Sequence, residues 1–233
     1  MKTIEVCLTP DLIHQHELSG KIVVVVDIFR ATSCIVTGLA HGVESMKPVG
    51  EVEETKALGK KGYLMAGERG GIKVPEFDMG NSPFEYQADE VKGKKIAIST
   101  TNGSQAIIKS AEAQEIIIGA FLNLESIAQY VLQSKINVVI HCAGWKGTPN
   151  LEDTLFAGAL IDECVEEMGT VGDSALVAHQ LYIANHENLF GIAKQSSHAE
   201  RLSGFGIEED LEFCMTENEY QVVPKLEDGE IVG

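Results

Sequence analysis

Short polar segments that follow apolar runs carry the residue types best suited to chemistry in this chain. The first is Asp27-Ile-Phe-Arg30-Ala-Thr32, which directly follows the apolar run 22–26. A carboxylate at the end of a buried strand can hold a divalent cation, and an arginine at a helix start can grip phosphate oxygens with two donors. The structural alternative is that Asp27 caps the helix and Arg30 is its partner. The segment alone leaves both interpretations open.

Three familiar phosphate-handling motifs are absent. Phosphatases of the haloacid dehalogenase type need a second Asp two residues after the first, and Phe29 occupies that position. No Cys has an Arg six residues later, so the tyrosine-phosphatase loop is missing. No Gly-Lys-Ser/Thr sequence is present, which excludes the Walker motif.

Two further segments pair acids with glycines or small polar residues. In Gly67-Glu68-Arg69-Gly70-Gly71, a carboxylate stands beside a guanidinium on a flexible backbone, which suits a metal-and-phosphate site as well as a solvated turn. The segment Asp78-Met-Gly-Asn81-Ser82-Pro83 belongs to the same long loop, 70–92. Asn81 and Ser82 are candidate phosphate contacts, although capping of a helix is the simpler interpretation.

A hydroxyl-rich turn and an acidic helix start complete the candidates. Thr100-Thr101-Asn102-Gly103-Ser104 lies between a predicted strand and a predicted helix, where free N–H groups and the helix dipole favour anions. Simple capping is the alternative there. Glu152-Asp153 falls in the first turn of another predicted helix. The dipole favours acids at that place in any case, and the competing hypothesis is a second source of metal-binding carboxylates.

Alternating strands and helices must position these segments. We predict strands at 22–26, 44–49, 63–66, 95–100, 115–118 and 136–142, and helices at 30–41, 53–60, 104–113, 123–133 and 151–168. Such alternation predicts a three-layer α/β/α fold on a mostly parallel sheet, in a single domain over 1–233. The last third, about 170–233, is less regular, with helices expected at 174–193 and 199–203 and a closing strand or hairpin at 222–233. Ligands bind beyond the carboxyl ends of strands in such sheets.

Charge and composition narrow the partners. The 233 residues carry 35 acids against 18 Lys and Arg, a formal net charge of −17, so nucleic acid and anionic membranes are not expected partners. The excess acids serve solubility or metal binding. Five widely spaced Cys indicate reduced thiols in the cytoplasm rather than a zinc site or disulfides. We see no signal peptide or membrane span. The scattered histidines, such as His14, His16, His179 and His186, are poor metal-site candidates.

Taken in order, these segments resemble the 2-phosphosulfolactate phosphatase family. The similar stretches are 25–33, 66–71, 77–83, 100–104, 119–123, 142–144, 151–153 and 157–158, with Val223-Pro224 and Gly229 in the tail. Each is weak alone, and their shared order is specific. The family more often has Leu at Phe29 and Thr at Ser104, and Ser keeps the hydroxyl.

The resemblance implies an α/β enzyme that uses Mg²⁺ to hydrolyse (2R)-2-phospho-3-sulfolactate to sulfolactate and phosphate, a step towards coenzyme M. We hypothesise that Asp27 holds the metal with Glu68 or Asp153, and that Asp27 or Glu152 is the base. An aspartyl intermediate on Asp27 stays open. The expected phosphate-binding residues are Arg30, Arg69, Asn81, Ser82, Thr100, Thr101, Asn102, Gly103, Ser104 and Asn123, while Arg30, Arg69, Lys73 and Lys146 are the nearest cations for a sulfonate.

Two alternatives keep the same anion site. One is a phosphatase of this scaffold that acts on another small phosphorylated hydroxy acid. The other is a protein that binds phosphorylated metabolites without catalysis. In all cases the expected partner is a small anionic phosphoester, and a homodimer is left open.

Overall fold

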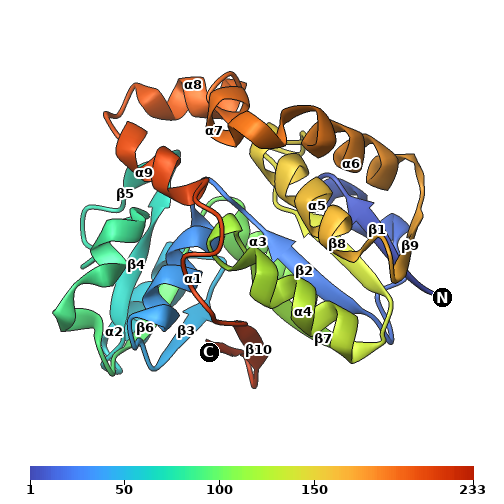
Figure 1. Ribbon diagram of the computed structural model, residues 1–233. Coiled ribbons are helices and arrows are strands. Elements are labelled where there is room, and N and C mark those ends of the chain that lie inside the picture. The colour runs from blue at the N-terminus through green and yellow to red at the C-terminus, as the bar shows by residue number, and fades with distance from the viewer.

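The computed structural model describes all residues, 1–233, as a twisted sheet with helices on both sides (Figure 1). The strands are β1 Lys2–Cys7, β2 Ile22–Val26, β3 Ser45–Pro48, β4 Leu64–Arg69, β5 Ile72–Lys73, β6 Lys95–Ser99, β7 Glu115–Gly119, β8 Val138–Cys142, β9 Met168–Val171, β10 Lys225–Glu227 and β11 Glu230–Val232. The helices are α1 Ala31–Ala40, α2 Val52–Gly59, α3 Gly103–Lys109, α4 Leu124–Ser134, α5 Leu151–Cys164, α6 Asp173–Asn185, α7 Leu189–Ala193, α8 Ser197–Ser203 and α9 Glu208–Cys214.

The sheet consists of two groups of parallel strands joined by the C-terminal hairpin, with the short antiparallel β5 at one edge. Its order is β5-β4-β6-β3-β11-β10-β7-β2-β8-β1-β9. Antiparallel β10 and β11 lie between β7 and β3, where Lys225 is opposite Ile117 and Ile231 is opposite Met46. Glu230 of β11 also contacts Ser45 of β3, Lys95 of β6 and Tyr63, which directly precedes β4. The hairpin predicted over 222–233 is therefore present, and it closes the gap between the two groups.

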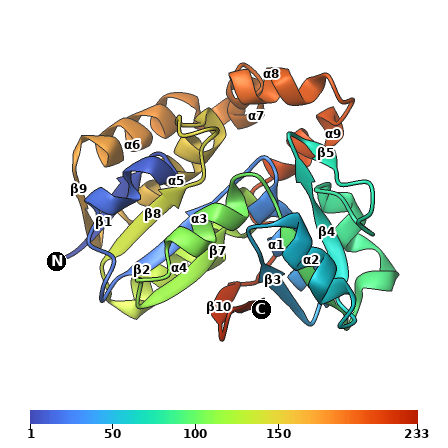
Figure 2. The same cartoon turned by 180° about the vertical axis from the view of Figure 1, so that it is seen from behind.

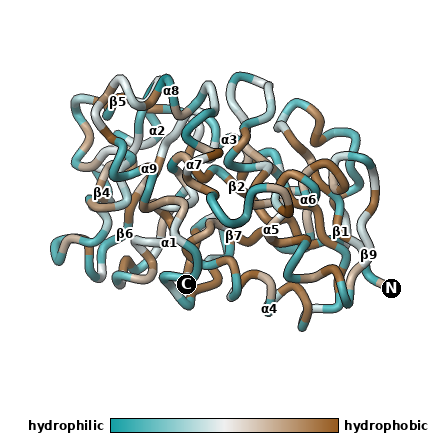
Figure 3. The backbone as a smooth tube through the Cα atoms, turned by 45° about the horizontal axis from the view of Figure 1, so that its top comes forward, coloured by the Kyte–Doolittle hydropathy of each residue, from teal (hydrophilic) through white to brown (hydrophobic).

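Strand β2 lies at the centre of the hydrophobic core. All five of its side chains are fully buried, as the uninterrupted apolar run predicts. Val24 and Val26 pack in a cluster with α4 and α5, whereas Val23 and Val25 pack in a second cluster with α1 and α3. The three-layer α/β/α prediction is confirmed. Figure 2 shows α3 and α2 on the face turned away in Figure 1. In Figure 3 the hydrophobic colours gather in the interior and the hydrophilic colours in the outer loops.

Several predicted boundaries are wrong. The helix expected over 151–168 ends at Cys164, because 168–171 form β9, which pairs with β1. Strand β1 itself is missing from the prediction, although Ile4 and Val6 alternate with polar residues as in a half-buried strand. The helix expected over 174–193 breaks after Asn185 into a 3₁₀ turn and α7. The long loop 70–92 contains β5 and two 3₁₀ helices, Pro83–Gln87 and Asp89–Val91.

The last three helices lie across the end of the sheet that is formed by the carboxyl ends of the parallel strands. In both Figure 1 and Figure 2, α7, α8 and α9 pass from the side of α6 to the side of β5 along that end. Ala199 and Leu202 of α8 and Leu211 of α9 join the main core cluster, so these helices are packed onto the body. The irregular C-terminal third thus covers the carboxyl ends of the strands. None of the helices combines the length and apolar character needed to cross a membrane.

Candidate active site

Asp27 stands at the carboxyl end of β2 and is 5% exposed. The turn after it is fixed by the next hydroxyls: the Asp27 amide donates to Thr32 Oγ1 at 3.0 Å, and Ser33 Oγ donates to the Ile28 carbonyl at 2.9 Å. The Phe29–Arg30 peptide bond is cis. The two hydrogen bonds hold the first candidate segment in a strand-to-helix turn. Its carboxylate is held inside the protein rather than at a solvated helix cap.

Glu152 lies in the first turn of α5 and has no exposed surface. Its Oε1 is 2.6 Å from His198 Nδ1, and Asn150 Nδ2 lies 3.2 Å from the same nitrogen. The other oxygen, Oε2, is buried without any hydrogen-bond partner. Burial of a carboxylate oxygen without a hydrogen-bond donor costs free energy. We therefore interpret Oε2 as an atom that binds a ligand of the protein.

The carboxylate oxygens of Asp153 and Glu68 accept hydrogen bonds from backbone amides. Asp153 accepts from the amides of Ile28 and Gly144, at 2.9 and 3.0 Å. Glu68 accepts from the amides of Thr101 and Gly71, at 2.7 and 2.6 Å. Each acid therefore ties two loops together at the strand ends. Both lie in the predicted place, but their bonds favour a positioning role over metal ligation.

The hydroxyl-rich turn folds back on itself and leaves two amides without an acceptor in the chain. Ser104 Oγ accepts from the Thr100 amide, and Thr100 Oγ1 accepts from the Ser104 amide, both at 3.0 Å. The amides of Asn102 and Gly103 donate to no acceptor of the chain. A Cβ on Gly103 would lie 2.8 Å from Asp27 Oδ2, so this turn touches the carboxylate. Two free donors thus lie beside Asp27 at the start of α3, where anions are favoured.

The arginines predicted to bind phosphate, Arg30 and Arg69, instead bind groups of the protein itself. Arg30 forms a buried ion pair with Asp210 of α9, and Ser82 Oγ donates to the same carboxylate at 2.9 Å. Arg69 donates to the Glu68, Ser99 and Gly50 carbonyls and to Ser99 Oγ, at 2.7 to 3.1 Å. Their role in phosphate binding stays a prediction that this arrangement does not favour.

The side chains of the two predicted amides, Asn123 and Asn81, differ in their hydrogen bonds. Asn123 donates to the Ile118 and Val222 carbonyls and accepts from the Ala120 amide, so it anchors the start of α4 to the tail. Asn81 is buried, and its Oδ1 has no partner. All three side-chain groups of Asn123 are satisfied, which leaves it no free donor for a phosphate.

Burial and neighbouring acids raise the pKa of Asp27 and of Asp153. Burial is the largest cause that raises the pKa of Asp27 to about 6, and the charges of Glu68 and Glu152 add to it, whereas His198 lowers it. Burial also raises the pKa of Asp153 well above its usual value, with Glu152 and Asp27 as the next causes. Four carboxylates therefore share one low-dielectric region, which a bound cation would stabilise.

A magnesium ion fits part of this donor set. No three His, Cys, Asp or Glu side chains form a ready-made metal cage. Mg²⁺, however, is commonly held by one or two carboxylates together with waters and substrate phosphate oxygens. Asp27 and Glu152 meet that description, because Glu152 Oε2 is unpartnered and Asp27 is close enough to feel its charge.

The C-terminal helices supply residues that the sequence does not single out. His198 and Arg201 lie one turn apart on α8, and both rest on the Trp145 ring. Asp210 on α9 holds Arg30. Their only local signal is the spacing of a histidine and an arginine on one short helix. Nothing in that spacing connects them to strand ends more than 45 residues away along the chain.

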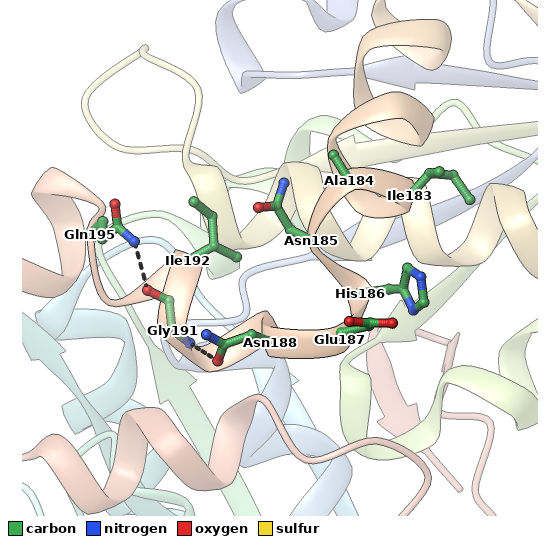
Figure 4. A pocket seen from close by; sticks show the side chains of 9 residues that line it. All are labelled: Ile183, Ala184, Asn185, His186, Glu187, Asn188, Gly191, Ile192 and Gln195. Atoms are coloured by element: carbon green, nitrogen blue, oxygen red, sulfur yellow. Dashed lines mark hydrogen bonds between the residues drawn. The ribbon is translucent and has the colours of Figure 1, made fainter.

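A separate hollow of about 400 Å³ lies where α6 passes into α7 (Figure 4). Asn188 accepts from the Gly191 amide at 3.1 Å, and Gln195 donates to the Gly191 carbonyl at 3.0 Å, so the polar side chains there hold the helix ends. None of the predicted site residues lines this hollow. The chemistry therefore belongs to the strand ends beneath α8.

Comparison with known proteins identifies the family. The model of the 2-phosphosulpholactate phosphatase family matches residues 7–229. A probable 2-phosphosulfolactate phosphatase of Caldanaerobacter subterraneus is 40% identical over 95% of this chain and 94% of its own length. Those of Thermotoga petrophila and Clostridium acetobutylicum are 42% and 36% identical, over 88% and 98% of this chain and 89% and 99% of their own.

The sheet places carboxylates and free amides at its strand ends, where ligands bind in such folds. With the family match and the names of the relatives, this makes the chain a phosphoric monoester hydrolase. The chain belongs to the 2-phosphosulfolactate phosphatase family. The predicted family is thereby confirmed.

Proposed function

We propose that this enzyme is a Mg²⁺-dependent phosphatase that hydrolyses (2R)-2-phospho-3-sulfolactate to sulfolactate and phosphate, a step in coenzyme M biosynthesis. One observation carries the proposal: a buried, unpartnered oxygen of Glu152 lies near Asp27, which touches a turn with two free amides. Family membership supports the substrate, because the relatives are named for it.

In this scheme the chain's own residues bind and orient the phosphoryl group. The amides of Asn102 and Gly103 donate to its oxygens and stabilise the charge that develops on them. Asp27 and Glu152 would hold Mg²⁺, which neutralises phosphoryl charge when bound. A carboxylate oxygen of Asp27 accepts the proton of the attacking water, while the bond from His198 Nδ1 to Glu152 Oε1 leaves Oε2 of Glu152 free for the metal. Asp153 and Glu68 keep the loops in place.

The test is phosphate release from a panel of small phosphoesters with Mg²⁺: phosphosulfolactate, phospholactate, glycerol 2-phosphate and an aryl phosphate. The proposal expects phosphosulfolactate to have the highest kcat/KM. Turnover without preference for the sulfonate would favour the broader phosphatase. Binding without turnover of any ester would favour a metabolite-binding protein and overturn the proposal.

Gly103→Ala should lower kcat/KM by about 10-fold or more, because a misplaced catalytic group costs about that much. A Cβ at this position would lie 2.6 Å from Ala31 Cβ and 2.8 Å from Asp27 Oδ2, so the carboxylate must move. Phosphate release measures the effect. Gly169→Ala is the matched control, because a Cβ there meets nothing closer than 3.6 Å. Equal activity of the two variants would contradict the placement of Asp27 against this turn.

A further inference from the structure

One cation near the carboxylates has unused donors. The guanidinium of Arg201 makes a single hydrogen bond, from Nη1 to the Gly70 carbonyl at 3.0 Å. Its Nε is buried and has no partner, and Nη2 forms no bond with the protein. Nε and Nη2 form one edge of the planar fork, the edge that pairs with two oxygens of a carboxylate or a similar anion.

The position of this fork is fixed from two sides. The Arg201 guanidinium carbon lies 3.8 Å above the centre of the Trp145 ring, and His198 stacks on the same ring at 5.6 Å. On the other side, a Cβ on Gly71 would lie 3.3 Å from Arg201 Nη1, so a glycine lets the loop after β4 approach α8. The arginine is therefore held between the loop after β4 and the loop after β8.

Arg201 lies beside two acids of the active site. It donates to the carbonyl of Gly70, two residues after Glu68, and it lies one turn after His198, which holds Glu152. A phosphoryl group beside Asp27 and the turn at Asn102 would thus leave the rest of a small substrate to extend towards Arg201. Arg30 pairs with Asp210, Arg69 bonds to carbonyls and Lys73 donates to the Asp78 carbonyl. Lys146 also lies over the Trp145 ring, but as a single flexible ammonium without the planar fork.

We propose that the free edge of Arg201 binds the second acidic group of the substrate, its sulfonate or carboxylate, and so sets the preference for phosphorylated hydroxy acids that carry one. This inference rests on the proposed function for its substrate class. Arg201 is a substrate-binding residue in this account. It takes no part in the bond-breaking step.

The first measurement is calorimetric binding of phosphate-free sulfolactate to the Mg²⁺-loaded enzyme. Arg201→Met should weaken binding by about 10- to 100-fold, the range for a lost charge-assisted pair. Arg201→Lys should recover only part of that loss, because it keeps the charge without the planar fork. Lys194→Met is the control, an exposed cation over the Phe190 ring in the same C-terminal segment. Unchanged binding in Arg201→Met, or no binding to the wild type, would overturn the inference.

The second measurement compares phosphate release by wild type and Arg201→Met. The inference expects kcat/KM for phosphosulfolactate to fall by about 10-fold or more, and that for glycerol 2-phosphate, which has no second acid, to stay within about threefold. An equal fall on both esters would show that Arg201 serves the phosphoryl group or the fold, against the inference. If wild type releases phosphate from neither ester, the proposed function fails, while the binding measurement still decides the role of Arg201.

Discussion

Asp27→Asn should reduce phosphate release by about 10³-fold or more while leaving the fold intact, because it removes the carboxylate at the centre of the proposed metal and phosphoryl site. The amide is nearly the same size, and the turn around it is held by Thr32 and Ser33 rather than by the carboxylate itself. Steady-state phosphate release measures the loss of activity, and a circular dichroism spectrum checks that the fold is intact. Asp89→Asn, at an exposed position, is the matched control. Turnover close to wild type would contradict the scheme.

The same variant should stabilise the metal-free protein at neutral and alkaline pH. The folded pKa of Asp27 is about 6, above the ordinary value of 3.8. Its favourable contribution is therefore complete below pH 3.8 and is lost as the pH rises through 6, where folding must bury an ionised carboxylate. Removal of that cost at pH 8 in EDTA should raise the free energy of unfolding by about 3 kcal/mol at most.

Urea unfolding in EDTA at pH 4 and pH 8 measures this difference. The gap between Asp27→Asn and wild type should be small at pH 4 and largest at pH 8. Added Mg²⁺ should close it, because the ion stabilises the ionised carboxylate of the wild type. A gap that is independent of pH would mean that Asp27 is not the titrating group.

Glu152→Gln should be nearly as damaging, with kcat lower by about 10²- to 10³-fold, because the substitution removes a proposed metal ligand beside the reacting phosphoryl group. The half-saturating Mg²⁺ concentration should rise as well. A purely structural role would lower stability without moving that concentration. Phosphate release over a Mg²⁺ titration separates the two outcomes. Glu125→Gln is the matched control, an acid in the first turn of α4 that is exposed to solvent.

The fold was largely predictable because the central strands are uniformly apolar. Five buried β-branched residues in β2, ending at Asp27, mark both the strand and the place where a ligand would bind. The edge strands carry weaker signals. Strand β9 has four residues, two of them glycine or threonine, and it is recognisable only through its pairing with β1.

The site was predictable only in part. Asp27, Glu68 and Glu152 follow from strand ends and a helix start, and the structure brings them within reach of one another's charge. Partners from distant sequence decide what each side chain does: Asp210 occupies Arg30, and His198 holds Glu152. No local pattern shows that α8 and α9 lie over the strand ends. The sequence alone therefore predicts a phosphate contact at Arg30, although Asp210 occupies its guanidinium.

The most direct test of the central claim is the rate of phosphate release from (2R)-2-phospho-3-sulfolactate by wild-type enzyme, measured with Mg²⁺ and after exhaustive treatment with EDTA. We expect turnover with Mg²⁺, loss of turnover in EDTA, and recovery of turnover when Mg²⁺ is restored. Undiminished phosphate release in EDTA would contradict the metal site formed by Asp27 and Glu152, and no release under either condition would contradict the proposed activity.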